Sequence, residues 1–205
     1  MDLSAPFESL FPTVDSAVLT VLAKSTKPRT GREIARLASR SQDATQRVLD
    51  RLTDQGLVLG REAGRARVYV LNEFHLAADP IFRLAYLRDT LIREVRERIE
   101  SWHQEPLHVS LFGSTARGES DLHSDIDIFL VRPAPVEEND KQWREQVEGL
   151  ADQVFEWTGN HAAIAEVGEG EVARLRKERP PIVGSLQADA IDLAGTPLRS
   201  LLEPD

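Results

Sequence analysis

Residues 111–131 read LFGSTARGESDLHSDIDIFLV, and this stretch decides the fold of the second half of the chain. The alternating run Leu107–Phe112 predicts a buried strand, which a Gly-Ser turn ends. After a polar loop, the run that starts at Asp125 predicts a second strand. Side chains at positions i and i+2 of a strand point to the same face, so Asp125 and Asp127 are expected to lie side by side.

This arrangement indicates a site for a metal ion and a phosphate. Two neighbouring carboxylates repel each other unless a cation lies between them. Mg²⁺ suits them because it is a hard ion that takes carboxylate and phosphate oxygens. Gly113 lets the backbone approach a phosphate closely, and Ser114 begins a short helix whose free N–H groups favour an anion. The residues therefore predict binding of Mg²⁺ and a nucleoside triphosphate, with ATP as the first candidate, in the layout that nucleotidyl transfer uses.

The same 21 residues resemble the signature of the polymerase-β-like nucleotidyltransferase superfamily, and within it the minimal nucleotidyltransferases. The resemblance implies an α/β domain over residues 105–205, a mixed sheet with flanking helices. It implies that Gly113 and Ser114 hold the nucleotide phosphates, that Asp125 and Asp127 hold Mg²⁺, and that Ser114 and both aspartates are the catalytic positions. It also places Arg117 near the pocket.

Two features of this site remain open in the sequence. Arg117 either contacts the nucleotide or forms a salt bridge with the loop acids Glu119 or Asp121. The family pattern also has a third carboxylate, commonly the base that takes the proton of the attacking group, on a strand after a helix and a glycine.

A helix is predicted over residues 138–158, and its inward residues are expected to be Trp143, Val147, Leu150, Val154 and Trp157. The predicted strand 161–167 follows, and in it Ala163 occupies the position expected for this acid. Glu166 is the nearest acid, but it lies three residues further on and points to the opposite face. A shifted alignment would let Glu166 fill the position. The sequence therefore predicts nucleotide and metal binding, with transfer either slow or absent; the alternative is an active enzyme.

The first part of the chain predicts a small helical module. Thr30 and Glu33 have the spacing of a capping box, which predicts a helix over residues 31–38. A tight turn leads to a helix over residues 42–55, and two strands follow around a basic turn. The run RVLDRLTDQGLVLGREAGRARVYVLN resembles the winged helix-turn-helix regulators of the MarR-like kind, which implies a mostly α, α+β domain over residues 10–74.

Charge supports a nucleic-acid partner for this module. The chain has a net charge of −9, but the segment 24–67 has 11 Lys and Arg against five Asp and Glu, a balance of +6, which leaves −15 for the remainder. Double-stranded DNA is the expected partner, although winged helices also serve as protein-protein modules. The residues expected near base edges are Ser41, Gln42, Thr45 and Gln46, and those expected at phosphates are Arg47, Arg51, Arg65 and Arg67.

A connecting helix is predicted over residues 79–104. Its apolar residues form one stripe, namely Ile81, Leu84, Leu87, Leu91, Val95, Ile99 and Trp102. Two alternatives follow: the stripe packs on the chain's own domains, or it forms the seam of a homodimer. The final segment, 181–202, alternates apolar and polar residues and is interpreted as containing a strand, with no role for Asp189 or Asp192.

The sequence thus predicts a two-domain protein, a winged helix followed by a nucleotidyltransferase-like domain. There are no cysteines, no apolar run long enough to span a membrane and no signal peptide, so a cytoplasmic protein is expected. Three functions remain open. The first is a DNA-binding transcriptional regulator whose second domain binds nucleotide and Mg²⁺. The second is an active enzyme that transfers a nucleoside monophosphate to a protein or small molecule. The third is the antitoxin of a toxin partner, which rests on analogy alone.

Overall fold

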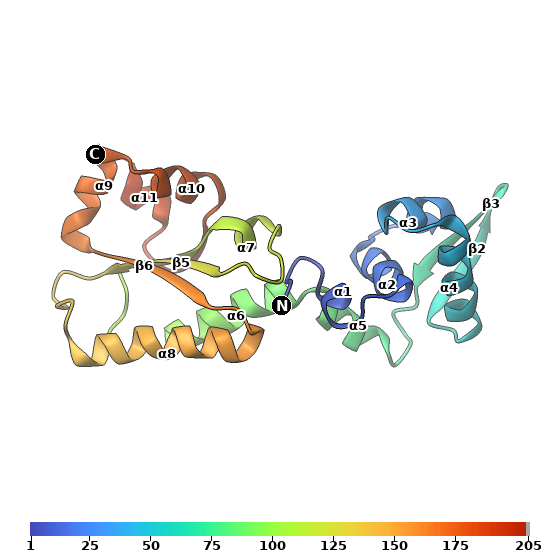
Figure 1. Ribbon diagram of the computed structural model, residues 1–205, viewed down its shortest axis with the longest axis horizontal. Helices are drawn as coiled ribbons and strands as arrows, with labels where there is room; N and C mark the ends of the chain where they lie inside the picture. Colours follow the sequence, from blue (N-terminus) through green and yellow to red (C-terminus); the bar gives the residue numbers. More distant parts are fainter. Residues whose placement is uncertain (204–205) are drawn as a thin grey trace. The chain divides into compact units, whose positions relative to one another are not determined.

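The computed structural model describes residues 1–203, and the chain divides into two compact units. The first unit is Ala5–Leu87, and the second consists of Met1–Ser4 and the chain from Arg88 onward (Figure 1). The predicted single connecting helix is wrong. It is two helices, α5 (Ala78–Ala85) and α6 (Leu87–Glu100), and Tyr86 between them leaves the helical conformation with φ −112° and ψ 31°.

Short helices and a three-stranded antiparallel sheet make up the unit Ala5–Leu87. Thr13 caps the second helix and Thr30 caps the third, each in a reciprocal capping box, as the sequence predicts for Thr30 and Glu33. The sheet order is β1-β3-β2. Besides α5 the elements are α1 (Pro6–Leu10), α2 (Val14–Lys24), β1 (Arg29–Thr30), α3 (Gly31–Leu37), α4 (Gln42–Asp54), β2 (Val58–Ala63) and β3 (Ala66–Leu71).

The core of this unit lies where α2, α3 and α4 pack on the sheet. Val18, Ile34 and Leu49 are fully buried and come from the three helices in turn, while Val58 and Tyr69 close the core from the strands. Burial of such side chains contributes about 1.5–3 kcal/mol each to stability. The three helices are therefore held by one shared apolar cluster.

A four-stranded mixed sheet forms the centre of the second unit. Its strand order is β6-β5-β4-β7; β5 and β6 are parallel, and the other two pairs are antiparallel. The strands are β4 (His108–Leu111), β5 (Ile126–Arg132), β6 (Ala162–Gly168) and β7 (Ile191–Gly195). The predicted mixed α/β character of this domain is confirmed.

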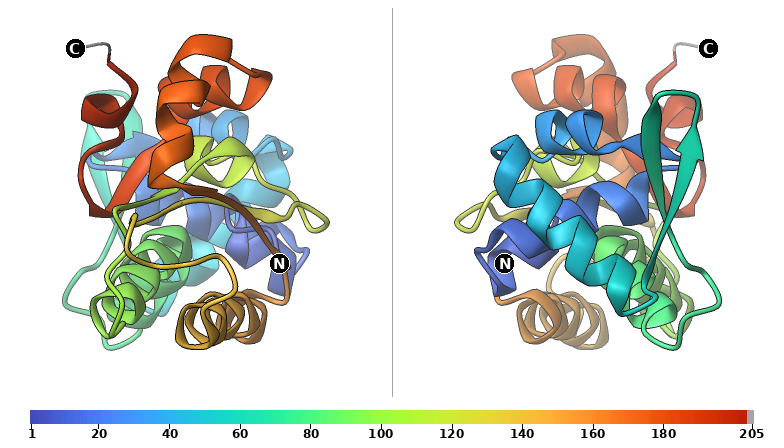
Figure 2. Two further views of the ribbon diagram at one scale, coloured as in Figure 1. Left: turned by 90° about the vertical axis from the view of Figure 1, so that its left-hand side faces the viewer. Right: turned by 90° about the vertical axis from the view of Figure 1, so that its right-hand side faces the viewer.

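Helices cover both faces of this sheet, as the two views of Figure 2 show. On one face lie α6 and α8 (Lys141–Thr158). On the other lie the short helix α7 (Gly113–Arg117) and the C-terminal helices, which are α9 (Val172–Glu178, preceded by the 3₁₀ turn η1, Glu169–Glu171), α10 (Pro181–Asp189) and α11 (Leu198–Leu202). The face with the C-terminal helices buries Phe129 and Val131 of β5, and the face with α6 and α8 buries Ile126, Ile128 and Leu130.

The apolar stripe of the connecting segment packs inside the chain. Leu91, Val95 and Ile99 of α6 are buried in the second unit, and the Trp102 ring meets Trp143 of α8 edge to face at 5.6 Å. In the first unit, α5 places Ile81 against the core described above. Internal packing was one of the two predicted alternatives. The other, a homodimer seam, stays a prediction: Leu91, Val95, Ile99 and Trp102 are covered within one chain, whereas Ile81, Leu84 and Leu87 are half-buried.

Two further predictions about elements need correction. The segment expected to alternate as a strand begins with the helix α10, because Pro181 occupies its first turn, where proline is favoured, and only Ile191–Gly195 forms a strand. Trp157, expected inward on α8, is 37% exposed, and Thr158 takes the buried position beside it. Within residues 1–203 no helix is long and apolar enough to cross a membrane.

Candidate functional site

The predicted Gly-Ser turn lies at the end of β4, directly against β5. Gly113 has φ +71°, a conformation that L side chains rarely adopt, and a Cβ built on it would overlap the carboxylate oxygen Oδ2 of Asp127. The Phe112 N–H donates to the Asp127 carbonyl oxygen at 3.0 Å. Backbone and side chain of Asp127 are thus both held against the turn, and only glycine fits between them.

The turn opens the short helix α7. Phe112 at its N-cap supplies no side-chain acceptor, and the N–H groups in the first turn of a helix have no partner within the helix. Ser114 stands in this first turn and is half-buried. Free N–H groups beside a small hydroxyl suit a phosphate, as the sequence predicts, although a helix this short contributes only part of a macrodipole.

Asp125 directly precedes β5 and lies close enough to Asp127 to act on its charge. Asp127 is half-buried, and burial raises the pKa of its carboxyl; the nearby Asp125 carboxylate raises it further, and Arg117 lowers it. Asp125 is exposed. The Asp127 carboxylate is therefore costly to ionise beside Asp125, and a cation bound between the two would remove that cost.

These two oxygen donors fit the metal that the sequence implies. Mg²⁺ is commonly held by one or two carboxylates together with substrate phosphates and water. Within residues 1–203 no cluster of three His, Cys, Asp or Glu side chains could hold a metal ion by itself. The protein thus offers a partial set of ligands, which a triphosphate would complete.

Arg117 forms two ion pairs. Its Nε lies 2.7 Å from Oε2 of Glu119, and its Nη1 pairs with Oδ2 of Asp189. Both carboxylates raise the pKa of the guanidinium, Glu119 more than Asp189. Of the predicted loop partners Glu119 is present, whereas Asp121 caps its own turn through the His123 N–H and the Ser124 hydroxyl.

Asp189 was missed in the sequence. It ends α10, and its side chain is 11% exposed beside Arg117. Recognition of Pro181 as a helix start would have placed Asp189 at the end of a helix, but nothing in the sequence shows that α10 packs near α7. Arg117 also acts electrostatically on Asp127, so the arginine stands between the candidate site and the C-terminal helices.

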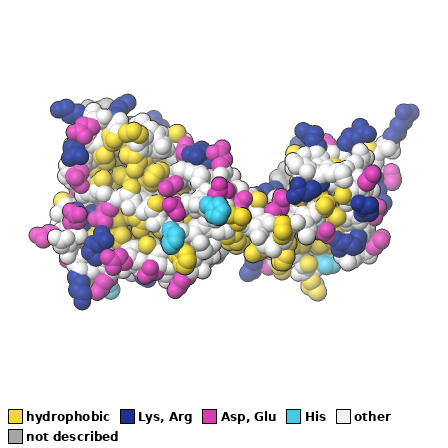
Figure 3. All heavy atoms as spheres, in the orientation of Figure 1, with side chains coloured by type: hydrophobic (Ala, Val, Ile, Leu, Met, Phe, Trp, Pro, Cys, Tyr) yellow, Lys and Arg dark blue, Asp and Glu magenta, His cyan; other side chains and the backbone are white. Residues whose placement is uncertain are grey.

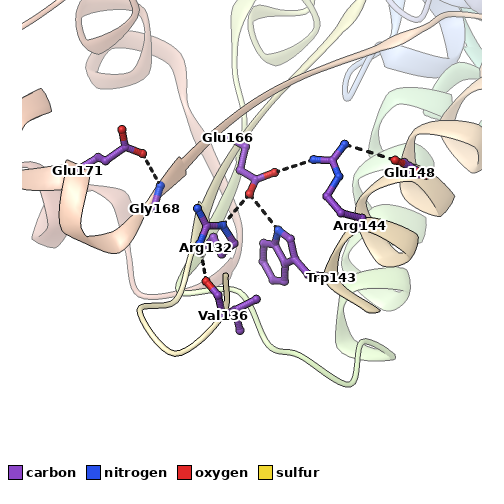
Figure 4. A network of polar contacts seen from close by, with 8 residues as sticks. All are labelled: Arg132, Val136, Trp143, Arg144, Glu148, Glu166, Gly168 and Glu171. Carbon is purple, nitrogen blue, oxygen red and sulfur yellow. Dashed lines mark hydrogen bonds and ion pairs between the residues drawn. The ribbon is translucent and has the colours of Figure 1, made fainter. Parts of the chain in front are cut away.

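The strand register places Ala163 directly beside Asp127, as partners in the parallel pair β5–β6. Glu166 pairs instead with Leu130, whose side chain lies on the opposite face of the sheet. There Glu166 accepts from Arg132 Nε and from Trp143 Nε1, each at 3.0 Å, and pairs with Arg144 at 3.5 Å (Figure 4). A carboxylate held in this way is not free to act at Asp127.

The residues predicted to contact DNA fall into two groups. Gln42, Gln46, Arg65 and Arg67 line one hollow of about 430 Å³, together with the start of α3 and Tyr69. Gln46 donates to the Tyr69 hydroxyl at 2.9 Å and to Asp50 at 2.8 Å, and the Arg67 guanidinium lies over the Tyr69 ring. Figure 3 shows Lys and Arg side chains spread over the visible face of this unit.

Of the other residues predicted to contact DNA, Ser41, Thr45 and Arg51 have structural roles. Thr45 is fully buried, so its prediction as a base contact is wrong: it precedes Val48 and Leu49 by three and four residues and shares their inward face. Arg51, expected at a phosphate, pairs with Asp15. Ser41 caps α4 by accepting from the Ala44 N–H, and Arg47 is exposed.

Comparison with known proteins finds one family. Residues 92–180 match the nucleotidyltransferase domain family. No curated protein matches the chain. One solved structure is similar, human N-acetylserotonin methyltransferase in complex with SAM, at 15% identity; the match covers 46% of this chain and about 30% of that one. Its TM-score of 0.29 is too low to imply a shared fold.

The family match spans the Gly-Ser turn, both aspartates and the strand with Ala163. Within this region Asp127 lies against Gly113 and pairs with Ala163. Over residues 92–180 the chain is therefore similar to the nucleotidyltransferase domain family.

Proposed function

We propose that this protein binds a nucleoside triphosphate together with Mg²⁺ at the end of β4 and β5, and that it serves as a regulator more than as a fast transferase. Gly113 and the first turn of α7 receive phosphate oxygens, and Asp125 and Asp127 hold the metal. When bound, Mg²⁺ supplies orientation of the triphosphate and neutralises its charge. The chain's own residues position the phosphates and keep the two carboxylates fixed at the turn.

The observation that carries this proposal is the pairing of Ala163 with Asp127. A methyl group stands where a carboxylate would take a proton from an attacking hydroxyl, and general-base catalysis is commonly worth about 10²–10⁴-fold in rate. Binding needs the turn and the two aspartates, all of which are present, whereas rapid transfer also needs a base. The alternative, transfer of a nucleoside monophosphate to a protein or small molecule, requires a base from the acceptor itself.

The test is nucleotide binding with and without Mg²⁺. We expect ATP, or another of the four common triphosphates, to bind in the presence of Mg²⁺ and to bind far more weakly without it. Asp125→Asn and Asp127→Asn should each remove the Mg²⁺ dependence. If no triphosphate binds under either condition, the proposal is wrong. Incubation with labelled triphosphates and candidate acceptors tests the alternative, an active transferase. Rapid labelling of an acceptor supports this alternative if the Asp127→Ala variant does not label it.

A second function, DNA binding by the unit Ala5–Leu87, is supported by one specific observation. Two glutamines of α4 and two arginines of the β2–β3 hairpin line the same hollow. The order of helices, the β1-β3-β2 sheet and the basic hairpin support the proposal of a winged helix, in which such a helix enters the major groove. Glutamine can pair with adenine, and arginine with phosphates or guanine.

DNA binding is tested by fluorescence anisotropy with duplexes from upstream of the protein's own gene and with scrambled duplexes of equal length. We expect the upstream duplex to bind more tightly at two salt concentrations. Equal, weak binding to all duplexes would exclude a specific regulator. An antitoxin role remains a prediction, and the presence of a toxic protein encoded beside the gene would be its first support.

A further inference from the structure

The strand β6 is an open edge of the four-stranded sheet. In residues 1–203 it pairs with β5 on one side and with no strand on the other. The Ile126 N–H donates to the carbonyl of His161, which fixes the pattern of the parallel ladder. Successive residues of a strand direct their N–H and C=O groups to alternate sides, so those of Ala162, Ile164 and Glu166 point away from β5.

A groove runs along this open edge. Its volume is about 620 Å³, and its walls are β6 and the helix α8. Ile164, Val147 and Ala151 provide apolar surface, so the groove has the two parts that an extended peptide needs: backbone groups for a ladder and pockets for alternate side chains.

Internal contacts fix one end of this groove. Glu166 is held by Arg132, Arg144 and the Trp143 indole, as Figure 4 shows. Glu171 accepts from the Gly168 N–H at 2.9 Å, which ends the open edge at that residue. This end of the groove is therefore preformed, and a preformed edge lowers the entropy cost of adding a strand.

The charge of the lining decides what fits. Four glutamates and two arginines line the groove, a balance of −2. Both arginines are committed to Glu166, and Glu171 to Gly168, which leaves Glu138 and Glu148 as the acids that face a ligand, the latter in a long contact of 3.4 Å with Arg144. A second copy of this chain would bring the same acids against each other, which is unfavourable.

We propose that the groove between β6 and α8 binds an extended, Lys- or Arg-bearing segment of a partner protein, which adds to the sheet as a further strand beside β6. The outward backbone groups of Ala162, Ile164 and Glu166 supply the hydrogen bonds, and Glu138 and Glu148 select the charge. The proposal is independent of nucleotide binding, because the groove lies on the face of the sheet opposite to Asp127.

Synthetic peptides test this with the full chain. One fluorescent peptide alternates Val with Lys, and its counterpart alternates Val with Glu. We expect the Lys peptide to bind, measured by anisotropy, and the Glu peptide to bind at least about tenfold more weakly, an effect of two charge contacts. The charge reversal Glu138→Lys/Glu148→Lys should invert this preference. Binding of neither peptide, or equal binding of both, overturns the proposal.

A matched pair of variants tests the strand addition itself. Ala162→Pro removes one outward N–H, at an edge position that tolerates proline, while Ala162→Ser keeps it. We expect the proline variant to bind the Lys peptide about fivefold more weakly, the loss of one hydrogen bond, and the serine variant to bind as wild type. Equal affinity of the two variants contradicts strand addition. If sedimentation shows that the wild type and the serine variant are dimers while the proline variant is a monomer, a second copy of the chain is the occupant and the proposal is wrong.

Discussion

Ala163 and Asp127 are direct partners in the parallel pair of strands β5 and β6. Asp127 carries a carboxyl whose pKa is raised by burial and by Asp125, and Ala163 beside it is exposed and small. Asp127 thus has a carboxylate that a bound cation would stabilise. Ala163 has no group that could act as a base, and its small side chain leaves space for one.

Ala163→Asp should therefore increase transfer. The new carboxylate would stand beside Asp127 without burial, and we expect a labelling rate about a hundredfold higher or more, as general bases commonly provide. The rate of nucleotide incorporation into acceptor checks this, with Ala163→Asn as the uncharged control of similar size. If the rate does not rise above that of Ala163→Asn, the missing carboxylate does not limit the reaction.

Asp127→Asn should stabilise the protein while removing its response to metal. The pKa of Asp127 is raised in the folded state, so between about 3.9 and that raised pKa the folded chain binds more protons than the unfolded chain, and stability falls as pH rises through this window. The asparagine side chain of the variant does not ionise, so it does not lose stability in this way. We expect a higher Tm for Asp127→Asn at neutral pH, and a Tm increase on adding Mg²⁺ in wild type alone. A lower Tm for the variant would contradict the stated cause of the pKa shift.

Gly113→Ala should destabilise the protein by more than the cost of backbone strain alone. Gly113 and Gly118 have nearly the same positive φ, +71° and +72°, but a Cβ meets the Asp127 carboxylate at the first position and nothing within 4 Å at the second. We expect Gly118→Ala to cost about 1–2 kcal/mol of unfolding free energy for the left-handed conformation. Gly113→Ala should cost more and also weaken nucleotide binding. Equal losses in urea unfolding would show that the contact with Asp127 is unimportant.

His108 should make the second unit sensitive to acid. Its ring is fully buried, Nδ1 lies 2.8 Å from the Thr196 carbonyl, and burial lowers its pKa. The unfolded chain takes up a proton near pH 6.5, about the ordinary value for histidine, before the folded chain does, so stability falls as pH drops below that value. Tm measured from pH 8 to pH 5.5 checks this. The fall in Tm should be smaller in His108→Gln. An equal fall in both proteins would show that other titratable groups cause it.

Arg65→Ala should weaken DNA binding alike for all sequences and reduce the slope of log affinity against log salt by about one, as expected for one phosphate contact. Arg51→Ala is the matched control, because Arg51 pairs with Asp15 and should leave the slope unchanged. Gln42→Ala should lower the preference for the upstream duplex without altering the slope. If Arg65→Ala and Arg51→Ala reduce this slope equally, the DNA does not bind at the predicted surface.

Much of this structure is predictable from local signals. The capping box of Thr30 and Glu33 and the Gly-Ser turn depend on neighbours in the chain, and each forms as expected. The face of Glu166 also follows from its distance of three residues from Ala163. Such features need only backbone geometry.

The features that were missed depend on packing between distant segments. Tyr86 interrupts a helix that has no proline or glycine there, and the boundary between the two units follows directly after Leu87. The contact of Arg117 with Asp189 joins residues 72 positions apart. Thr45 differs, since its helical spacing from Leu49 already indicated the buried face and was overlooked.

The network around Glu166 has a consequence for the history of this domain. The run Ala-Ala-Ile-Ala along β6 offers little to distinguish one register from another, and the ion pair of Glu166 with Arg132, on the far face, fixes it. Ala163 is exposed and takes no part in this ion pair. Alanine codons that end in a pyrimidine become aspartate codons by a single nucleotide change. Under the function proposed above, one mutational step therefore separates this site from one with a third carboxylate.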